Sequence, residues 1–277
     1  MSTGRRVITA KSLVDEAGLP EHEAARLLQK ATGRSRTELA SQPAIERHEA
    51  VRFTELTERR RSGEPLQYIE GSSQFGPIEV AVDPRVLIPR PETEQLWELL
   101  VARMSDSDPG VIVDLGTGSA NLAIALKHSF PAAQVHAVDL SADALAVAEG
   151  NIRASGLDVA IYLGDLFTAL PEELAGRVDV AVSNPPYIAR EERDTLPAEV
   201  RDHEPAIALF GGEDGLDVLR RIIKDAPRWL RPGGLLACEI GAGQGAAVRK
   251  LASDLDPIII QDLSGRDRFL IAQKGME

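Results

Sequence analysis

The tetrapeptide Asn184-Pro185-Pro186-Tyr187 holds the residue types best suited to chemistry in this chain. It follows the apolar run 178–183, and a buried strand must end there because proline cannot donate a hydrogen bond to a sheet. The Asn184 side-chain oxygen and the Pro185 carbonyl are two acceptors that suit the two protons of one NH2 group. The ring of Tyr187 adds a flat face for stacking. This Asn-Pro-Pro-Tyr turn therefore predicts a seat for a planar group with an amino nitrogen.

A second candidate feature is a glycine turn that follows the apolar run 111–115. Gly116 and Gly118 permit a sharp turn and a close approach of the backbone to a ligand. Asp139 ends the next apolar run, where a carboxylate can accept both ribose hydroxyls of an adenosine. A dinucleotide fingerprint needs a third glycine where the chain has Asn121. Together with Asp114 at the strand end, the turn favours S-adenosylmethionine over NAD.

Each of these features, taken alone, also has a purely structural explanation. The glycine turn can be a tight strand–helix connection, and Asp139 can be a helix N-cap. Asp165, which closes the third apolar run before Leu166, is expected near the adenine amino group. Because these features fall at successive strand ends, and ligands of open α/β sheets bind at those ends, we favour the ligand interpretation.

Composition and charge exclude several classes of protein. The chain has 277 residues, a net charge of -12, and 43% hydrophobic but only 4% aromatic residues, which fits an aliphatic α/β core. An acidic chain is not built to neutralise phosphates, so we expect no direct nucleic-acid binding. The first 62 residues are mildly basic, with 12 Lys and Arg against 9 Asp and Glu.

Cysteine content and targeting signals point to a cytoplasmic enzyme without a metal. Cys238 is the only cysteine, which excludes an intrachain disulfide and a cysteine-rich metal site. Residues 1–6 are not followed by a long apolar stretch, so we predict no signal peptide. No run approaches the roughly 20 apolar residues of a membrane span. We therefore expect a cytoplasmic monomer that does not bind membranes.

The first 92 residues predict a helical domain and a linker. Residues 1–63 form the helical domain, in which Ala24, Leu27, Leu28 and Ala31 make one apolar face and a helix over 44–61 ends before Gly63. We interpret it as a substrate-docking domain, in which the basic run 59–61 is either a docking surface or a solvated face. Residues 64–92 form a linker, with a β-hairpin that uses 78–82 and 86–88 between turn signals.

Residues 93–277 predict one α/β domain. Strands are expected at 111–115, 134–139, 159–163, 178–183, 235–240, 258–262 and 268–272, with helices between the first six. This pattern predicts a doubly wound sheet with right-handed crossovers. The last two strands must be antiparallel, because residues 263–267 are too few for a parallel crossover. Such a sheet resembles the Rossmann-like sheet of class I methyltransferases.

Several segments resemble the HemK/PrmC family of N5-glutamine methyltransferases. They are the Asn-Pro-Pro-Tyr turn and the segments 64–69, 87–93, 204–217 and 262–268. The resemblance implies that the enzyme uses S-adenosyl-L-methionine to methylate the glutamine of the Gly-Gly-Gln motif in peptide chain release factors. Ribosomal protein L3 glutamine methyltransferases are a similar alternative. A DNA adenine-N6 methyltransferase or a non-catalytic cofactor-binding protein is a more distant one.

The resemblance also implies roles for individual residues. Hydrogen bonds from the substrate NH2 to Asn184 and Pro185, with Tyr187 beside them, would orient the amide nitrogen. The expected cofactor-binding residues are Asp114, Gly116, Thr117, Gly118, Ser119, Ala120, Asp139, Asp165, Leu166 and Asn184. The expected substrate-binding residues are Phe75, Arg90, Pro91, Glu92, Thr93, Asn184, Pro185, Pro186 and Tyr187. Ala120 departs from the family, which has glycine there, and we expect it to be tolerated.

Overall fold

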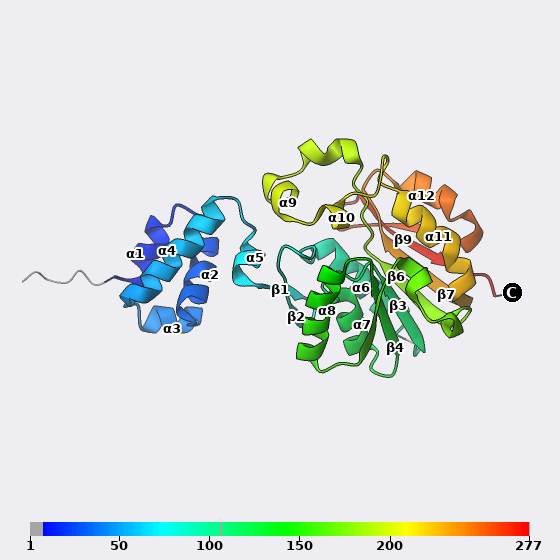
Figure 1. The fold of residues 1–277 in the computed structure, drawn as a ribbon, viewed down its shortest axis with the longest axis horizontal. Helices are drawn as coiled ribbons and strands as arrows, with labels where there is room; N and C mark the ends of the chain where they lie inside the picture. Colours follow the sequence, from blue (N-terminus) through cyan, green and yellow to red (C-terminus); the bar gives the residue numbers. More distant parts are fainter. Residues whose placement is uncertain (1–7, 106, 277) are drawn as a thin grey trace, which may run out of the picture. The chain divides into compact units, whose positions relative to one another are not determined.

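The computed structural model describes residues 8–105 and 107–276 (Figure 1). Their internal contacts divide them into two units. A helical unit reaches Gly71 and also includes Ala198–His203, while the larger unit comprises Ser72–Pro197 and the chain from Glu204 onward. Residues 1–6, on which the prediction about a signal peptide depends, lie outside the described part. In that part, no helix combines the length and apolar character needed to cross a membrane.

The helical unit is built around the apolar face predicted for its second helix. Leu27 and Leu28 of that helix are fully buried against Phe53. Gly33 ends the helix in the left-handed conformation, and Ser35 begins the next one with a capping box. The helices are α1 (Ala10–Glu16), α2 (Glu21–Thr32), α3 (Arg36–Ser41), α4 (Arg47–Arg61), α5 (Leu66–Glu70) and α9 (Ala198–His203).

The basic run 59–61 is engaged within the helical unit. Arg59 pairs with Glu64 at 2.5 Å, and Arg61 donates to the backbone oxygen of Ala17. Arg60 binds Glu23 through Nε at 2.7 Å and Glu199 of α9 through Nη1 at 2.9 Å. These arginines therefore hold the helical unit together. The sequence had suggested two other roles for them, a docking surface or a solvated face.

The hairpin after the helical unit differs from the predicted one. Strand β1 (Ser72–Phe75) pairs with β2 (Ile78–Ala81), whereas residues 86–88 form no strand. At the end of β2, the Asn151 side chain accepts a hydrogen bond from the Ala81 N–H at 2.7 Å and donates one to the Ala81 carbonyl at 3.0 Å. Residues 86–88 thus follow a turn at Asp83 and contribute buried side chains without joining the sheet.

The larger unit contains a seven-stranded sheet in the order β5-β4-β3-β6-β7-β9-β8. The first five strands in this order are parallel, and β9 is antiparallel to both of its neighbours, as predicted. The strands are β3 (Val111–Leu115), β4 (Gln134–Asp139), β5 (Val159–Leu163), β6 (Val178–Ser183), β7 (Leu230–Glu239), β8 (Ile258–Gln261) and β9 (Asp267–Gln273).

Helices cover both faces of this sheet (Figure 1). Helices α6, α7 and α8 lie on one side, and α11 and α12 lie on the other. Proline occupies the first position of α6, where its missing N–H costs nothing. The helices are α6 (Pro91–Arg103), α7 (Asn121–Ser129), α8 (Ala142–Ser155), α10 (Ala206–Leu209), α11 (Asp217–Trp229) and α12 (Gly245–Leu251), with short 3-10 turns at Leu166–Ala169, Glu172–Leu174, Arg190–Thr195 and Ser253–Leu255.

The strand order places a switch point between β3 and β6. From β3 the sheet continues through β4 and β5 in one direction, and β6 and β7 extend it in the other. Crevices at such points bind ligands at the carboxyl ends of the strands. The core beneath is mainly aliphatic, with the rings of Phe167 and Trp229 stacked within it. It includes the thiol of Cys238 in β7, which is fully buried, and this burial raises its pKa.

Candidate active site

The Asn-Pro-Pro-Tyr turn leaves the sheet at the carboxyl end of β6. The buried Ser183 hydroxyl donates to the Leu115 carbonyl at 2.6 Å, which joins the ends of β6 and β3. Behind the turn, a β-carbon at Gly211 would lie 2.3 Å from the Pro186 oxygen, and one at Gly215 would lie 2.1 Å from the Tyr187 oxygen. Only glycine allows this approach, so the 211–215 loop fixes the backbone of the turn.

The glycine turn lies at the neighbouring strand end. Gly116 and Gly118 both have positive φ, and the Thr117 hydroxyl donates to Asp114 Oδ2 at 2.6 Å. Asp114 Oδ1 is buried and has no hydrogen-bond partner among the described residues. Burial raises the pKa of this carboxyl to about 7. An unsatisfied acceptor beside a cavity fits a ligand that brings a hydrogen-bond donor, such as the amino group of S-adenosylmethionine.

At the end of β4, two backbone N–H groups orient the Asp139 carboxylate so that it can accept hydrogen bonds from hydroxyl groups. Its Oδ2 accepts the Gly118 N–H at 2.8 Å, and its Oδ1 accepts the Ser141 N–H at 2.9 Å. Each oxygen keeps a further lone pair, so the carboxylate can still accept two ribose hydroxyls. Burial raises the pKa of Asp139 as well.

Asp165 follows the end of β5, and its carboxylate forms an ion pair with Arg221 of α11. Both residues line the same pocket as Asp114 and Asp139. Arg221 was not foreseen in the sequence, because nothing in α11 marks it as facing a ligand. An adenine amino group at Asp165 would share this carboxylate with the guanidinium.

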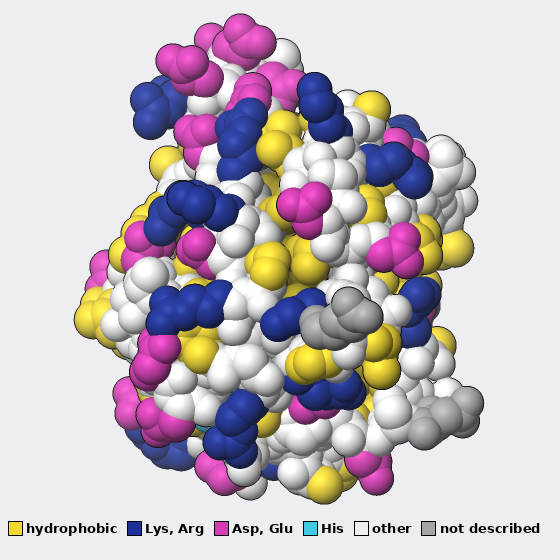
Figure 2. Space-filling model, turned by 90° about the vertical axis from the view of Figure 1, so that its right-hand side faces the viewer, with side chains coloured by type: hydrophobic (Ala, Val, Ile, Leu, Met, Phe, Trp, Pro, Cys, Tyr) yellow, Lys and Arg dark blue, Asp and Glu magenta, His cyan; other side chains and the backbone are white. Residues whose placement is uncertain are grey.

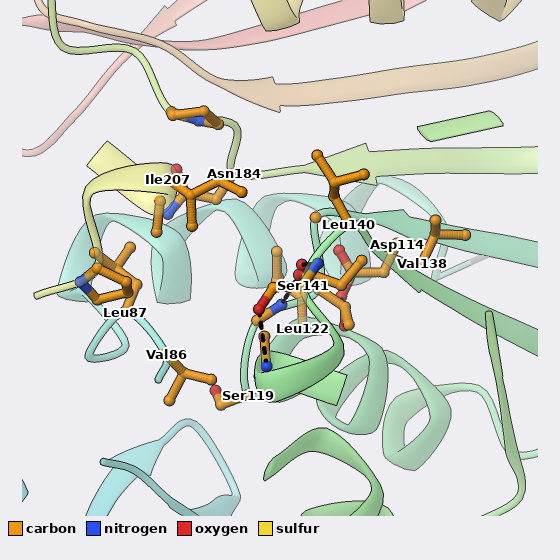
Figure 3. A pocket seen from close by; sticks show the side chains of 18 of the residues that line it. Val86, Leu87, Asp114, Ser119, Leu122, Val138, Leu140, Ser141, Asn184 and Ile207 are labelled. Atoms are coloured by element: carbon orange, nitrogen blue, oxygen red, sulfur yellow. Dashed lines mark hydrogen bonds between the residues drawn. The ribbon is translucent and has the colours of Figure 1, made fainter. Parts of the chain in front are cut away.

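One pocket brings these groups together with Asn184 (Figure 3). Its lining also includes apolar side chains that the sequence did not single out, among them Val86, Leu140 and Ile207. Leu140 and Ile207 are 58% and 55% exposed, so apolar surface of both is available to pack against the face of a planar ligand. The expected site residues that line the pocket are Thr93, Asp114, Gly116, Thr117, Gly118, Ser119, Asp139, Asp165, Leu166, Asn184 and Pro186.

Other expected site residues do not line this pocket. Phe75 is 1% exposed within the hairpin, and Ala120 is fully buried at the N-cap of α7 with φ of 64°. Arg90 is the N-cap of α6, and its Nη2 bonds both Glu204 oxygens at 2.6 and 2.7 Å. The remaining ones are Pro91 and Glu92 in the first turn of α6, and Pro185 and Tyr187 in the Asn-Pro-Pro-Tyr turn.

Two buried glutamates complete the site, and the sequence assigned a role to neither. Glu204 holds Arg90 and immediately precedes Pro205, Ile207 and Ala208, which line the pocket. Glu239 ends β7 with no exposed surface and accepts from the hydroxyls of Thr93 and Tyr187. The signal available in the sequence was a charged residue directly after the apolar run 235–238.

These features define a class of enzyme. A parallel sheet with an antiparallel last strand, a glycine turn after β3 and an acidic residue at the end of β4 are typical of S-adenosylmethionine-dependent methyltransferases of class I. Solved structures share the fold: a methyltransferase from Pyrococcus furiosus (TM-score 0.53, 19% identity, 73% of this chain and 91% of that chain) is one. Another is a 16S rRNA methyltransferase of T. thermophilus, in complex with AdoMet and guanosine (TM-score 0.52, 20% identity, 73% and 49%).

Sequence relatives narrow the class to one family. The PrmC N-terminal domain model matches residues 7–71, and the methyltransferase small domain model matches residues 94–200. The release factor glutamine methyltransferase of Thermosynechococcus vestitus is 44% identical over 93% of this chain and 92% of its own length. That of Streptomyces coelicolor is 40% identical over 98% and 97%. The chain belongs to the release factor glutamine methyltransferase family.

Proposed function

We propose that this enzyme transfers a methyl group from S-adenosyl-L-methionine to the side-chain amide nitrogen, N5, of the glutamine in the Gly-Gly-Gln motif of peptide chain release factors. The observation that carries the proposal is the position of Asn184. It stands at the end of β6 in the wall of a pocket whose other groups, Asp114 and Asp139, suit an amino acid and a ribose. Family membership supplies the substrate class.

The cofactor supplies an electrophilic methyl group. The residues of this chain bind the cofactor and orient the substrate amide. Asp114, the glycine turn and Asp139 would hold the cofactor. An amide nitrogen is a poor nucleophile, because its lone pair is delocalised into the carbonyl. Asn184 Oδ1 and the Pro185 carbonyl would accept hydrogen bonds from its two N–H groups and turn the lone pair toward the methyl group. The nitrogen would lose one of these protons to solvent as the N–CH3 bond forms and the sulfonium bond breaks. The contribution of the enzyme is then orientation and electrostatic stabilisation.

The proposal includes a cytoplasmic monomer that acts on protein and not on nucleic acid. The net charge of -12 supports it, because a nucleic-acid enzyme needs a continuous basic surface. On the face of the larger unit in Figure 2, basic side chains alternate with acidic ones. We further propose that residues 1–63 dock the release factor, with 64–92 as linker and 93–277 as catalytic domain. Retention on heparin at low salt would count against this part.

The deciding experiment is mass spectrometry of a purified release factor after incubation with the enzyme and S-adenosylmethionine. We expect a single methyl group on the glutamine of the Gly-Gly-Gln peptide. Ribosomal protein L3 and DNA serve as parallel substrates. Methylated L3 or DNA with an unmodified release factor would overturn the proposal in favour of one of those alternatives. Cofactor binding without any methylated product would instead indicate a non-catalytic protein.

A further inference from the structure

A line of hydrogen bonds behind the Asn-Pro-Pro-Tyr turn ends at Glu239. Asn184 Nδ2 donates to Thr93 Oγ1 at 2.9 Å, and the Thr93 hydroxyl donates to Glu239 Oε2 at 2.7 Å. Thr93 is 2% exposed and Glu239 is fully buried, so water does not compete with these bonds. The three residues come from α6, the turn after β6 and the end of β7, which lie far apart in the sequence.

A second hydrogen bond connects the other end of the turn, Tyr187, to the same carboxylate. The Tyr187 hydroxyl donates to Glu239 Oε1 at 3.2 Å. The guanidinium of Arg268 lies 5.8 Å from the centre of the Tyr187 ring and also bonds the Ile240 carbonyl at 3.3 Å. Burial raises the pKa of Glu239, while Thr93, Arg268 and Tyr187 oppose that shift. Both ends of the Asn-Pro-Pro-Tyr turn are thus anchored on one carboxylate.

The direction of these bonds fixes which end of the Asn184 amide faces the pocket. The Arg268 cation and the hydroxyls of Thr93 and Tyr187 favour the ionised form of Glu239 against the effect of burial. An ionised Glu239 only accepts hydrogen bonds, so the Thr93 hydroxyl then donates to it and has only lone pairs left for Asn184. Only the NH2 end of the Asn184 amide can donate to those lone pairs. The amide therefore cannot flip without losing a buried hydrogen bond. Its oxygen remains for the pocket, as an acceptor for a substrate NH2.

We propose that Glu239 is a positioning residue that, through the Thr93 hydroxyl, holds the Asn184 amide with its oxygen toward the substrate nitrogen. The inference rests on the proposed methylation of an amide nitrogen. It assigns Thr93 to the support of Asn184, whereas the sequence indicated a direct contact with substrate. Neither Glu239 nor Thr93 needs to contact the glutamine.

Thr93→Val and Thr93→Ser test the inference as a matched pair. Valine keeps the shape of threonine but removes the hydroxyl, and serine keeps the hydroxyl. We expect Thr93→Val to lower kcat for release-factor methylation by about tenfold or more, with the cofactor Kd and the KM for release factor nearly unchanged. Thr93→Ser should recover most of kcat. Equal rates in the two variants would overturn the inference.

A double-mutant cycle tests whether Glu239 acts through Thr93. Glu239→Gln should lower kcat in the wild-type background and have a smaller effect in the Thr93→Val background, because the link is already broken. Equal fold losses in both backgrounds would overturn this assignment. If Glu239→Gln fails to fold, the comparison of Thr93→Val with Thr93→Ser still decides.

Wild-type enzyme is assayed alongside the variants. If the wild-type enzyme leaves the release factor unmethylated, the proposed function is wrong. If the wild-type enzyme is active but the variants do not show the expected rates, only the positioning role is wrong.

Discussion

The two carboxylates Asp114 and Asp139 of the pocket differ in what their oxygens already bind. Both oxygens of Asp139 accept backbone N–H groups, whereas Oδ1 of Asp114 accepts nothing from the described residues. Burial therefore raises the pKa of Asp114 to about 7, above its value of 3.8 in the unfolded chain. With this sign, the group favours folding below about pH 4, and this contribution is lost as the pH rises through 7. A bound donor at Oδ1 offsets the loss.

Cofactor binding near pH 7 should accordingly release a proton from Asp114. A positively charged donor stabilises the carboxylate and lowers the pKa of Asp114, so protonated molecules ionise when they bind. Calorimetry in two buffers of different ionisation enthalpy measures the proton count. Asp114→Asn removes the titrating group and should abolish this proton release. Identical proton counts in wild type and variant would exclude Asp114 from the cofactor site.

Asn184 and Asp139 should separate turnover from cofactor binding. Asn184→Ala removes the acceptor for the substrate NH2, which should cost about 1–3 kcal/mol or more in the transition state and leave cofactor affinity nearly intact. Asp139→Ala should instead weaken cofactor binding. Calorimetry gives the affinities, and methyl transfer to release factor gives the rates. Wild-type turnover by Asn184→Ala, or wild-type affinity of Asp139→Ala, would remove that residue from its assigned role.

Ala120 carries local strain at the start of α7. Its φ of 64° lies in the left-handed region, which costs an L-residue roughly 1–2 kcal/mol. Ala120→Gly relieves this strain, but it also removes a buried methyl group and gives the unfolded chain more freedom. Because these effects offset each other, the free energy of unfolding should change by less than about 0.5 kcal/mol. Ala123→Gly, in the same helix and equally buried, should destabilise by about 1–2 kcal/mol. Equal losses in urea unfolding would disprove the strain.

At the scale of elements, the Arg90–Glu204 pair ties the start of α6 to the segment that enters α10. Glu204 is 7% exposed, and the residues that follow it line the pocket. Glu204→Gln weakens an ion pair in which one Arg90 nitrogen binds both oxygens of a buried carboxylate, which should loosen this segment. We expect faster tryptic cleavage after Arg190, Arg193 or Arg201 and weaker cofactor binding.

Arg153→Gln is the control for this variant. Arg153 forms an exposed helical pair with Glu149 at 3.6 Å, and such pairs contribute little to stability. Its loss should leave the cleavage rate unchanged. If Glu204→Gln is cleaved no faster than the control, the segment is held by other contacts.

The elements differ in how far the sequence could predict them. Strands β3 to β6 match their predicted limits, because each is an apolar run bounded by turn residues. Strand β1 escaped prediction because Ser72, Ser73 and Gln74 carry no apolar alternation, and residues 86–88 were predicted in its place as the partner of β2. In the site, the strand-end residues could be predicted from position alone. The roles of Glu204 and Glu239 could not be predicted, since their partners Arg90 and Thr93 lie more than 100 residues away in the sequence.

At the scale of the whole molecule, all residues that line the pocket belong to the larger unit. A chain that lacks residues 1–62 should therefore bind the cofactor with nearly wild-type affinity and bind the release factor more weakly. Calorimetry with each ligand measures both. A parallel Arg60→Gln variant tests whether the arginines act by holding the helical unit together, in which case thermal unfolding changes as well. Unchanged affinity of the shortened chain for release factor would reject a docking role for the helical unit.

The single buried cysteine makes the molecule convenient for fluorescence. Cys238 has no exposed surface, and its raised pKa leaves almost no thiolate, so maleimide reagents should not modify it in the folded enzyme. An Ile207→Cys variant would then carry one reactive thiol at the edge of the pocket, without prior removal of native cysteines. A dye at that thiol would report ligand arrival in real time, and stopped-flow traces would separate the arrival of cofactor from that of the protein substrate.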